Sequence, residues 1–218
     1  MIKTIIFDFD DTLKKSEHLK QLGFIETVKN ITGAQPIAKE LVSKHPGTPR
    51  YQMLGIILSA LKERGLINFN ILEQIIQEYA QKYGKLLTEK IIAAKEIPGA
   101  VNALKSLCQP YALYINSATP QNDINAIIDR LSWRTYFKGV FGSPPETKLE
   151  NIQQIINLEN IIPQQTVIIG DGKSDWQSAR QCKTKFIGIK GDYNQWPADI
   201  DFPILNDLTT LPEEIEKL

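Results

Sequence analysis

The sequence IIFDFDDTLKKS, residues 5–16, begins as an apolar run and then turns acidic. Three carboxylates fall within four positions, at Asp8, Asp10 and Asp11, and Thr12 follows them directly. Carboxylates this close repel one another and lose hydration when they are partly buried, so the cluster costs free energy. A bound cation or a reaction would offset that cost. The ordinary alternative is that these aspartates only cap the turn after a strand.

The composition excludes several classes of protein. With 218 residues, 42% of them hydrophobic, the chain is long enough for one large domain or two modest ones. Its 25 lysines and arginines balance 25 aspartates and glutamates, so no basic excess predicts nucleic-acid binding. Cys108 and Cys182 are far apart, which argues against a disulfide framework or structural zinc. The apolar start is too short for a signal peptide or a membrane span. We therefore expect a soluble, cytoplasmic monomer that binds neither nucleic acid nor membranes.

Short apolar runs alternate with helical patterns over much of the chain. The runs are typical of strands buried on both faces of a parallel sheet, and they lie at 2–8, 111–117, 140–141, 166–170 and 185–189, with a weaker edge candidate at 202–205. Helical patterns lie at 100–107, 123–131, 149–158 and 175–181. This alternation predicts an α/β core of the Rossmann-like type, with helices on both faces of a parallel sheet.

The region from Ser16 to Lys95 breaks that alternation, because its apolar residues repeat only at helical spacing. Ser16 has the residue type of a helix N-cap, and Thr48 followed by Pro49 predicts a second helix start. The sequence thus predicts an all-helical domain of residues 16–95, inserted after the first strand of an α/β core domain formed by 1–15 and 96–218. Residues 14–15 and 96–100 would connect the two domains.

Polar residues follow four of the predicted strands at the C-terminal end, where ligands gather in open α/β sheets. The first strand delivers the acidic cluster, and the second delivers Ser117. The third is followed by a proline-rich loop with Lys148, and the fourth by Asp171 and Asp175. This convergence predicts one site at that edge of the sheet.

The order of these motifs resembles the haloacid dehalogenase superfamily: DxDxT after a strand, a serine after a later strand, then a lysine, then GDxxxD. The resemblance covers nearly the whole chain, and the inserted helices correspond to the C1-type cap of that superfamily. The second aspartate of the first motif points to the phosphatase and phosphotransferase branch, which includes phosphoglycolate phosphatases and β-phosphoglucomutases. The resemblance implies that Asp8, Asp171 and the backbone carbonyl of Asp10 ligate a metal.

Phosphate ester chemistry assigns a role to each candidate. A phosphate dianion repels an attacking anion, so a nucleophilic Asp8 needs a divalent metal beside it, and hard oxygen ligands favour Mg²⁺. Asp8 would form an aspartyl-phosphate, while Asp10 would protonate the leaving oxygen and later activate water. Ser117 would bind a phosphoryl oxygen, and Lys148 would neutralise charge. Asp175 would hold a metal-bound water or orient Lys148.

Three further positions carry weaker expectations. Thr12 is expected beside the metal-bound water. Asp11 stands where many relatives have glycine, and it would either tighten the metal site or cap the turn. Arg50, on the first turn of a predicted cap helix, would clamp an anionic group of the substrate, although a solvated arginine is nearly as good an interpretation.

Together these residues predict a Mg²⁺-dependent phosphatase that acts on a small phosphorylated metabolite, with sugar phosphates favoured by the resemblance. Two alternatives remain open at this level: a phosphomutase of the β-phosphoglucomutase type, and a module that binds a phosphorylated ligand without catalysis. The sequence does not name the substrate.

Overall fold

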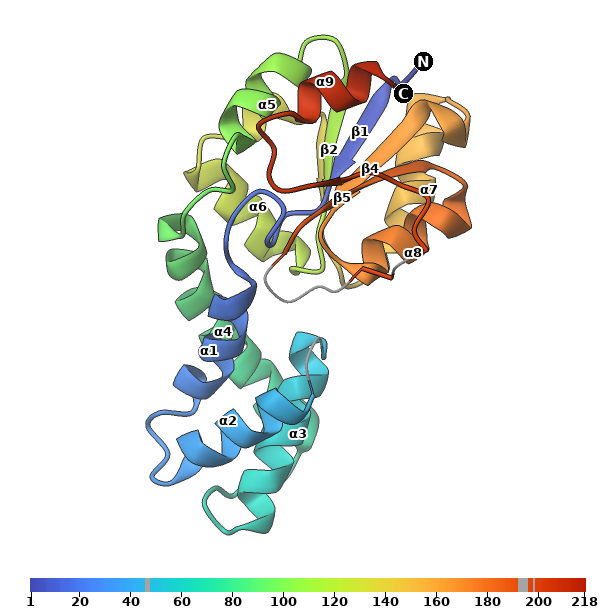
Figure 1. Ribbon diagram of the computed structural model, residues 1–218. Helices are drawn as coiled ribbons and strands as arrows, with labels where there is room; N and C mark the ends of the chain where they lie inside the picture. The colour runs from blue at the N-terminus through green and yellow to red at the C-terminus, as the bar shows by residue number, and fades with distance from the viewer. Residues whose placement is uncertain (46–47, 192–195, 198) are drawn as a thin grey trace. The chain divides into compact units, whose positions relative to one another are not determined.

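The computed structural model describes residues 1–45, 48–191, 196–197 and 199–218, and these form two compact units (Figure 1). The α/β unit consists of Met1–Lys15 and Ala94–Leu218, and the helical unit consists of Ser16–Ala93. The helical unit thus ends at Ala93, whereas the sequence analysis placed its end at Lys95. Within the part of the chain described, no helix combines the length and the apolar character needed to cross a membrane.

A parallel sheet of six strands forms the centre of the α/β unit, in the order β3-β2-β1-β4-β5-β6 (Figure 1). The strands are β1 (Thr4–Phe7), β2 (Ala112–Asn116), β3 (Gly139–Phe141), β4 (Thr166–Gly170), β5 (Lys185–Ile189) and β6 (Ile204–Leu205). The predicted α/β fold class is confirmed, and the predicted edge strand is the short β6. The strand order reverses direction at β1, which is the position where such sheets place their ligands.

Helices lie on both sides of this sheet (Figure 1). They are α5 (Ala100–Leu107), α6 (Gln121–Arg130), α7 (Lys148–Glu159), α8 (Lys173–Cys182) and α9 (Leu211–Glu216). The helices α7 and α8 contact each other and pack on one face, where Ile6 and Ile168 of the sheet meet Ile155. All four residues of β1 are buried, as expected for a strand covered on both faces. This burial holds the first strand, and the acidic residues after it, in the middle of the unit.

The helical unit contains α1 (Glu17–Thr27), α2 (Ala34–Lys44), α3 (Arg50–Glu63) and α4 (Leu72–Ala93). Its core includes the stacked rings of Phe24 and Tyr83, whose centroids are 4.5 Å apart. Leu54 and Leu58 of α3 are fully buried in the same unit. Apolar side chains at helical spacing give each helix one face that can be buried. Because these faces pack against one another, the stretch folds as a helical bundle.

One predicted helix start is wrong. Thr48 was expected to cap α3, but Pro49 occupies the N-cap position with extended backbone angles, and the helix begins at Arg50. The Thr48 hydroxyl donates instead to the carbonyl of His45, at 2.9 Å. Pro46 and Gly47, which precede Thr48, lie outside the described residues. Ser16 does occupy the N-cap position of α1, but its side chain makes no capping hydrogen bond there.

The two expected connecting segments lie side by side. Lys14 and Glu96 form an isolated antiparallel bridge, and the Lys15 N–H donates to the Lys95 carbonyl at 2.9 Å. Nearby, Gly99 adopts a left-handed conformation with φ +81°, and a Cβ there would lie 2.4 Å from the Thr209 nitrogen. Only glycine fits this position, because any side chain would clash with the backbone of Thr209. This close contact between two backbone segments sets the start of α5.

Two buried threonines of the sheet have hydroxyl groups that lower the stability of the folded protein, and a mutation can remove this effect. Thr4 and Thr166 are register partners on β1 and β4, both are fully buried, and neither hydroxyl has a hydrogen-bond partner among the described residues. An unsatisfied buried hydroxyl costs about 1–3 kcal/mol.

We expect Thr166→Val to raise the free energy of unfolding by roughly 0.5–1.5 kcal/mol in urea titrations. Thr27→Val is the control and should give no gain, because the Thr27 hydroxyl donates to the Gly23 carbonyl at 2.7 Å. A loss of stability in Thr166→Val would contradict this account.

Candidate active site

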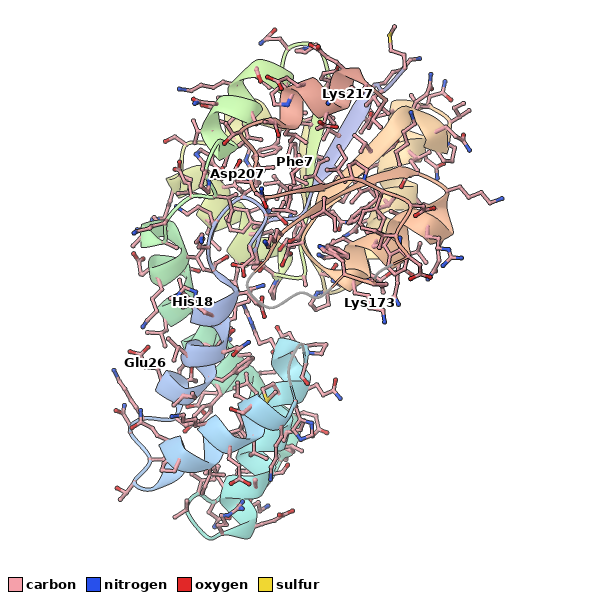
Figure 2. The ribbon with its side chains drawn as sticks, viewed as in Figure 1. Phe7, His18, Glu26, Lys173, Asp207 and Lys217 are labelled. Carbon is pink, nitrogen blue, oxygen red and sulfur yellow. The ribbon has the colours of Figure 1, made fainter. Side chains whose placement is uncertain are left out.

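The acidic residues predicted from the sequence meet where β1 and β4 end. Phe7, labelled in Figure 2, is the last residue of β1 and pairs in register with Ile169 of β4. The Asp8 N–H donates to the Ile169 carbonyl at 2.8 Å, which extends the pairing by one residue. The side chains of Asp8, Asp171 and Asp175 then come together: one carboxylate oxygen from each lies within 4.8 Å of the others. All three residues are buried.

Lys148 lies directly against two of these carboxylates. Its Nζ is 2.6 Å from Asp8 Oδ1 and 2.7 Å from Asp175 Oδ1. Lys148 is the first residue of α7, whose N-terminus is closed by a capping box between Thr147 and Glu150. A cation is unfavourable at a helix N-terminus, so the two ion pairs offset a cost that this position imposes. The capping box fixes the start of the helix and with it the place of the ammonium group.

The position of Asp175 depends on a glycine. Gly170 ends β4, and a Cβ there would lie 2.7 Å from the Asp175 Cβ, so a larger residue would displace this carboxylate. Asp175 Oδ2 also accepts a hydrogen bond from the Gly172 N–H at 3.3 Å, next to the first turn of α8. The structure thus brings Asp175 to Lys148, one of the two arrangements expected from the sequence.

Burial dominates the ionisation of the cluster. Burial raises the pKa of Asp8 to about 7 against the lowering effect of Lys148, and the charges of Asp175 and Asp10 raise it further. Burial, followed by the charges of Asp8 and Asp175, raises the pKa of Asp171 to about 9. Burial alone would lower the pKa of Lys148, but Asp175 and Asp8 outweigh burial and the pKa is raised. The ammonium of Lys148 therefore stays charged.

A divalent cation fits this cluster of carboxylates. The three carboxylates supply hard oxygen donors close together and buried, which is the donor set that Mg²⁺ and Ca²⁺ prefer. A cation there would favour the charged forms of Asp8 and Asp171, whose pKa values burial raises. The residues present are thus compatible with the metal expected from the sequence.

Thr12 connects the ends of the two central strands. Its hydroxyl accepts a hydrogen bond from the Asp171 N–H at 3.1 Å and donates to Asp8 Oδ2 at 3.3 Å. Thr12 is fully buried. It therefore orients the carboxylate of Asp8 directly, in addition to any contact with a metal-bound water.

Asp11 adopts a left-handed conformation with φ +53°. Aspartate tolerates this region better than most residues, and glycine tolerates it best. The Asp11 N–H donates to the Lys14 carbonyl at 2.7 Å and closes a tight turn. The backbone of Asp11 thus forms the turn that follows Asp8 and Asp10.

Asp10 is held by hydroxyl groups from the end of β2. Ser117 and Thr119 both donate to Asp10 Oδ2, at 3.5 Å and 3.3 Å. The analysis of the sequence included Ser117 and missed Thr119. The signal was a second hydroxyl residue two positions further along the same strand end, in INSATP.

Two asparagines were also missed. Asn116 Nδ2 donates to the Lys148 carbonyl at 2.9 Å, and Asn151 Nδ2 donates to Asn116 Oδ1 at 3.0 Å. Both residues are buried, so this chain of amides ties the end of β2 to the first turn of α7. It supports the backbone that carries the ammonium of Lys148.

Arg50 belongs to the helical unit. It is the first residue of α3, and its guanidinium lies 4.8 Å from the centroid of the Tyr83 ring in a cation–π contact. His18, labelled in Figure 2, belongs to α1 of the same unit. The role of Arg50 in binding substrate stays a prediction.

Comparison with known proteins agrees with this geometry. Residues 5–189 match the family model described as haloacid dehalogenase-like hydrolase. A phosphoglycolate phosphatase of Pseudomonas putida is 20% identical over 217 residues, which cover 96% of this chain and 78% of that protein.

Two solved structures share the fold over nearly their whole length. The "predicted phosphoglycolate phosphatase" of Haemophilus somnus has a TM-score of 0.78 and 19% identity, with 98% of each chain covered. A haloacid dehalogenase-type protein of Bacillus subtilis, described as bound to magnesium, has a TM-score of 0.71 and 18% identity, with 99% of each chain covered.

The raised pKa values predict how stability depends on pH without metal. Because the folded-state pKa values of Asp8 and Asp171 are raised above the unfolded value near 4, the folded protein binds more protons between about pH 4 and 9. Its stability in EDTA should therefore fall as the pH rises through this range. Thermal melts between pH 5.5 and 8.5 measure this, and Mg²⁺ should raise the melting temperature more at pH 8.5.

Asp171→Asn is the matched variant, since it removes one of the two groups and should flatten the decline in EDTA. Parallel pH profiles for the wild type and Asp171→Asn would contradict the assignment of the raised pKa to this carboxyl.

Proposed function

This chain belongs to the haloacid dehalogenase-like hydrolase family and is a hydrolase of the phosphatase type; we propose that it uses Mg²⁺ and an aspartyl-phosphate on Asp8 to hydrolyse a small phosphorylated metabolite. The observation that carries this proposal is the ion pair of 2.6 Å between Lys148 Nζ and Asp8 Oδ1 inside a buried cluster of acids. A nucleophilic carboxylate must be ionised, and this lysine lowers the pKa of Asp8 against the effect of burial.

The charges of the site suit a phosphate dianion. Asp8, Asp171 and the backbone carbonyl of Asp10 would hold Mg²⁺, which supplies positive charge to the nucleophile and the phosphoryl oxygens. Lys148 contributes a second positive charge next to Asp8, and the hydroxyl of Ser117 would donate to a phosphoryl oxygen. Magnesium in the Bacillus subtilis relative supports this choice of metal.

The reaction needs two displacements at phosphorus. In the first, an oxygen of Asp8 attacks phosphorus, the bond to the leaving oxygen breaks, and Asp10 gives its proton to that oxygen. In the second, the ionised Asp10 takes a proton from water, the water oxygen attacks phosphorus, and the bond to Asp8 breaks. Free phosphate is released and Asp10 is protonated again, so the residues return to their starting state.

The relatives support a small substrate. Phosphoglycolate phosphatases act on a compact phosphate ester, and the shared fold extends over almost the whole of this chain. Among small phosphorylated metabolites, sugar phosphates and phosphoglycolate are the classes to test first.

Phosphate release from p-nitrophenyl phosphate and from a panel of metabolites tests this proposal, with Mg²⁺ and with EDTA. We expect turnover with Mg²⁺, and a loss of at least about a thousandfold in Asp8→Asn, because the amide cannot attack phosphorus. Asp129→Asn is the control, since Asp129 pairs with Arg134 at the surface and should leave turnover unchanged.

The products distinguish the remaining possibilities. An isomeric sugar phosphate in place of free phosphate would identify a mutase. Ligand-dependent thermal shifts without any turnover on the panel would indicate a binding module and would refute the phosphatase proposal.

Arg50 supplies a separate prediction. If its guanidinium recognises an anionic group of the substrate, Arg50→Ala should raise KM for the best metabolite by about tenfold and leave KM for p-nitrophenyl phosphate unchanged. Arg64→Ala is the matched control, because Arg64 follows α3 at its other end. Equal KM values for the metabolite in wild type and Arg50→Ala would remove Arg50 from substrate recognition.

A further inference from the structure

We propose that Thr119 is a positioning residue for Asp10: its hydroxyl holds the carboxyl group in the orientation from which Asp10 protonates the leaving oxygen. The inference rests on the proposed function, because it assigns a role within that reaction. Its basis is the hydrogen bond of 3.3 Å from Thr119 Oγ1 to Asp10 Oδ2, between two residues that are 3% and 5% exposed.

The backbone of Thr119 is fixed from two sides. Its N–H donates to Ser117 Oγ at 3.1 Å, and its carbonyl accepts from the Ser143 N–H at 3.1 Å. A Cβ at Gly142 would lie 2.6 Å from that carbonyl oxygen, so glycine permits this close approach. The loop after β2 is thereby held against the segment after β3, and the hydroxyl of Thr119 has little freedom to leave Asp10.

Ser117 and Thr119 would have different roles, because each hydroxyl has only one proton to donate. Ser117 also donates to Asp10 Oδ2, at 3.5 Å, but a serine hydroxyl has only one proton to donate. When Ser117 turns this proton to a phosphoryl oxygen, its hydrogen bond to Asp10 is lost. Thr119 then keeps its hydrogen bond to Asp10 Oδ2 while the substrate is bound. This is the stage at which Asp10 must be oriented to protonate the leaving oxygen.

A fixed Oδ2 leaves the other oxygen of Asp10 to carry the proton. Protonation by an oriented acid matters most for esters with a poor leaving group, such as an alkyl phosphate, because the alkoxide is too basic to depart unprotonated. It matters little for p-nitrophenyl phosphate, whose leaving phenolate is stable. The effect of Thr119 should therefore depend on the leaving group, which a general loss of packing would not produce.

The experiment compares kcat/KM for an alkyl phosphate metabolite and for p-nitrophenyl phosphate, since this constant reports the steps up to cleavage of the ester bond. Thr119→Val keeps the shape and removes the hydroxyl. We expect it to lower kcat/KM for the alkyl ester about 10- to 100-fold and for the aryl ester less than about threefold. Thr119→Ser should restore both values to within a few-fold of wild type.

Two further variants serve as a control for the loss of a buried hydroxyl and as a substitute if Thr119→Val does not fold. Thr166→Val makes the same change at a buried threonine of β4 whose hydroxyl has no partner among the described residues, and it should leave the ratio of the two constants unchanged. Thr119→Ala replaces Thr119→Val if the latter does not fold, with the same expected ratio.

An equal loss on both esters, or no loss on either, would overturn the role of Thr119 while leaving the phosphatase intact. A wild-type protein that releases no phosphate from any ester would overturn the proposed function itself, and the positioning role with it. The wild-type rates thus test the phosphatase proposal, and the ratio of kcat/KM for the two esters in the variants tests the role of Thr119.

Discussion

The candidate active site is built around one constraint: three buried carboxylates meet at the end of a parallel sheet, where Lys148 pairs with two of them. Carboxylates within 4.8 Å of one another repel strongly where water is scarce, and burial raises the pKa of Asp8 and of Asp171. Lys148 opposes this repulsion through its ion pairs with Asp8 and Asp175. A divalent cation bound by the cluster would oppose it further.

Much of the surrounding structure serves to hold this arrangement. The strand order places β1 at the centre of the sheet, and the capping box sets the first residue of α7, so that Lys148 reaches across to Asp8. Hydroxyl groups then orient each acid separately: Thr12 donates to Asp8, and Thr119 donates to Asp10. In the proposed reaction the nucleophile and the acid, held by different partners, can be placed independently, one facing phosphorus and the other the leaving oxygen.

The sequence predicts well what depends on local pattern and less well what depends on contacts through space. The buried strands and the acids after them follow from apolar runs that end in charged residues, and 166–170 and 185–189 match β4 and β5 residue for residue. Thr119 and Asn151 were missed because their partners lie 109 and 35 positions away in the chain. The start of α3 was misplaced by one residue because proline is common at the first helical position, whereas Pro49 has extended backbone angles and occupies the N-cap.

The stereochemical course at phosphorus tests the central claim most directly. A phosphorothioate monoester with isotopically labelled oxygen would be hydrolysed in water of a third oxygen isotope, and the configuration of the thiophosphate product determined. Two displacements, the first by Asp8 and the second by water, each invert phosphorus, so the account predicts overall retention. Inversion would mean that water attacks the ester directly, and it would reduce Asp8 from nucleophile to metal ligand.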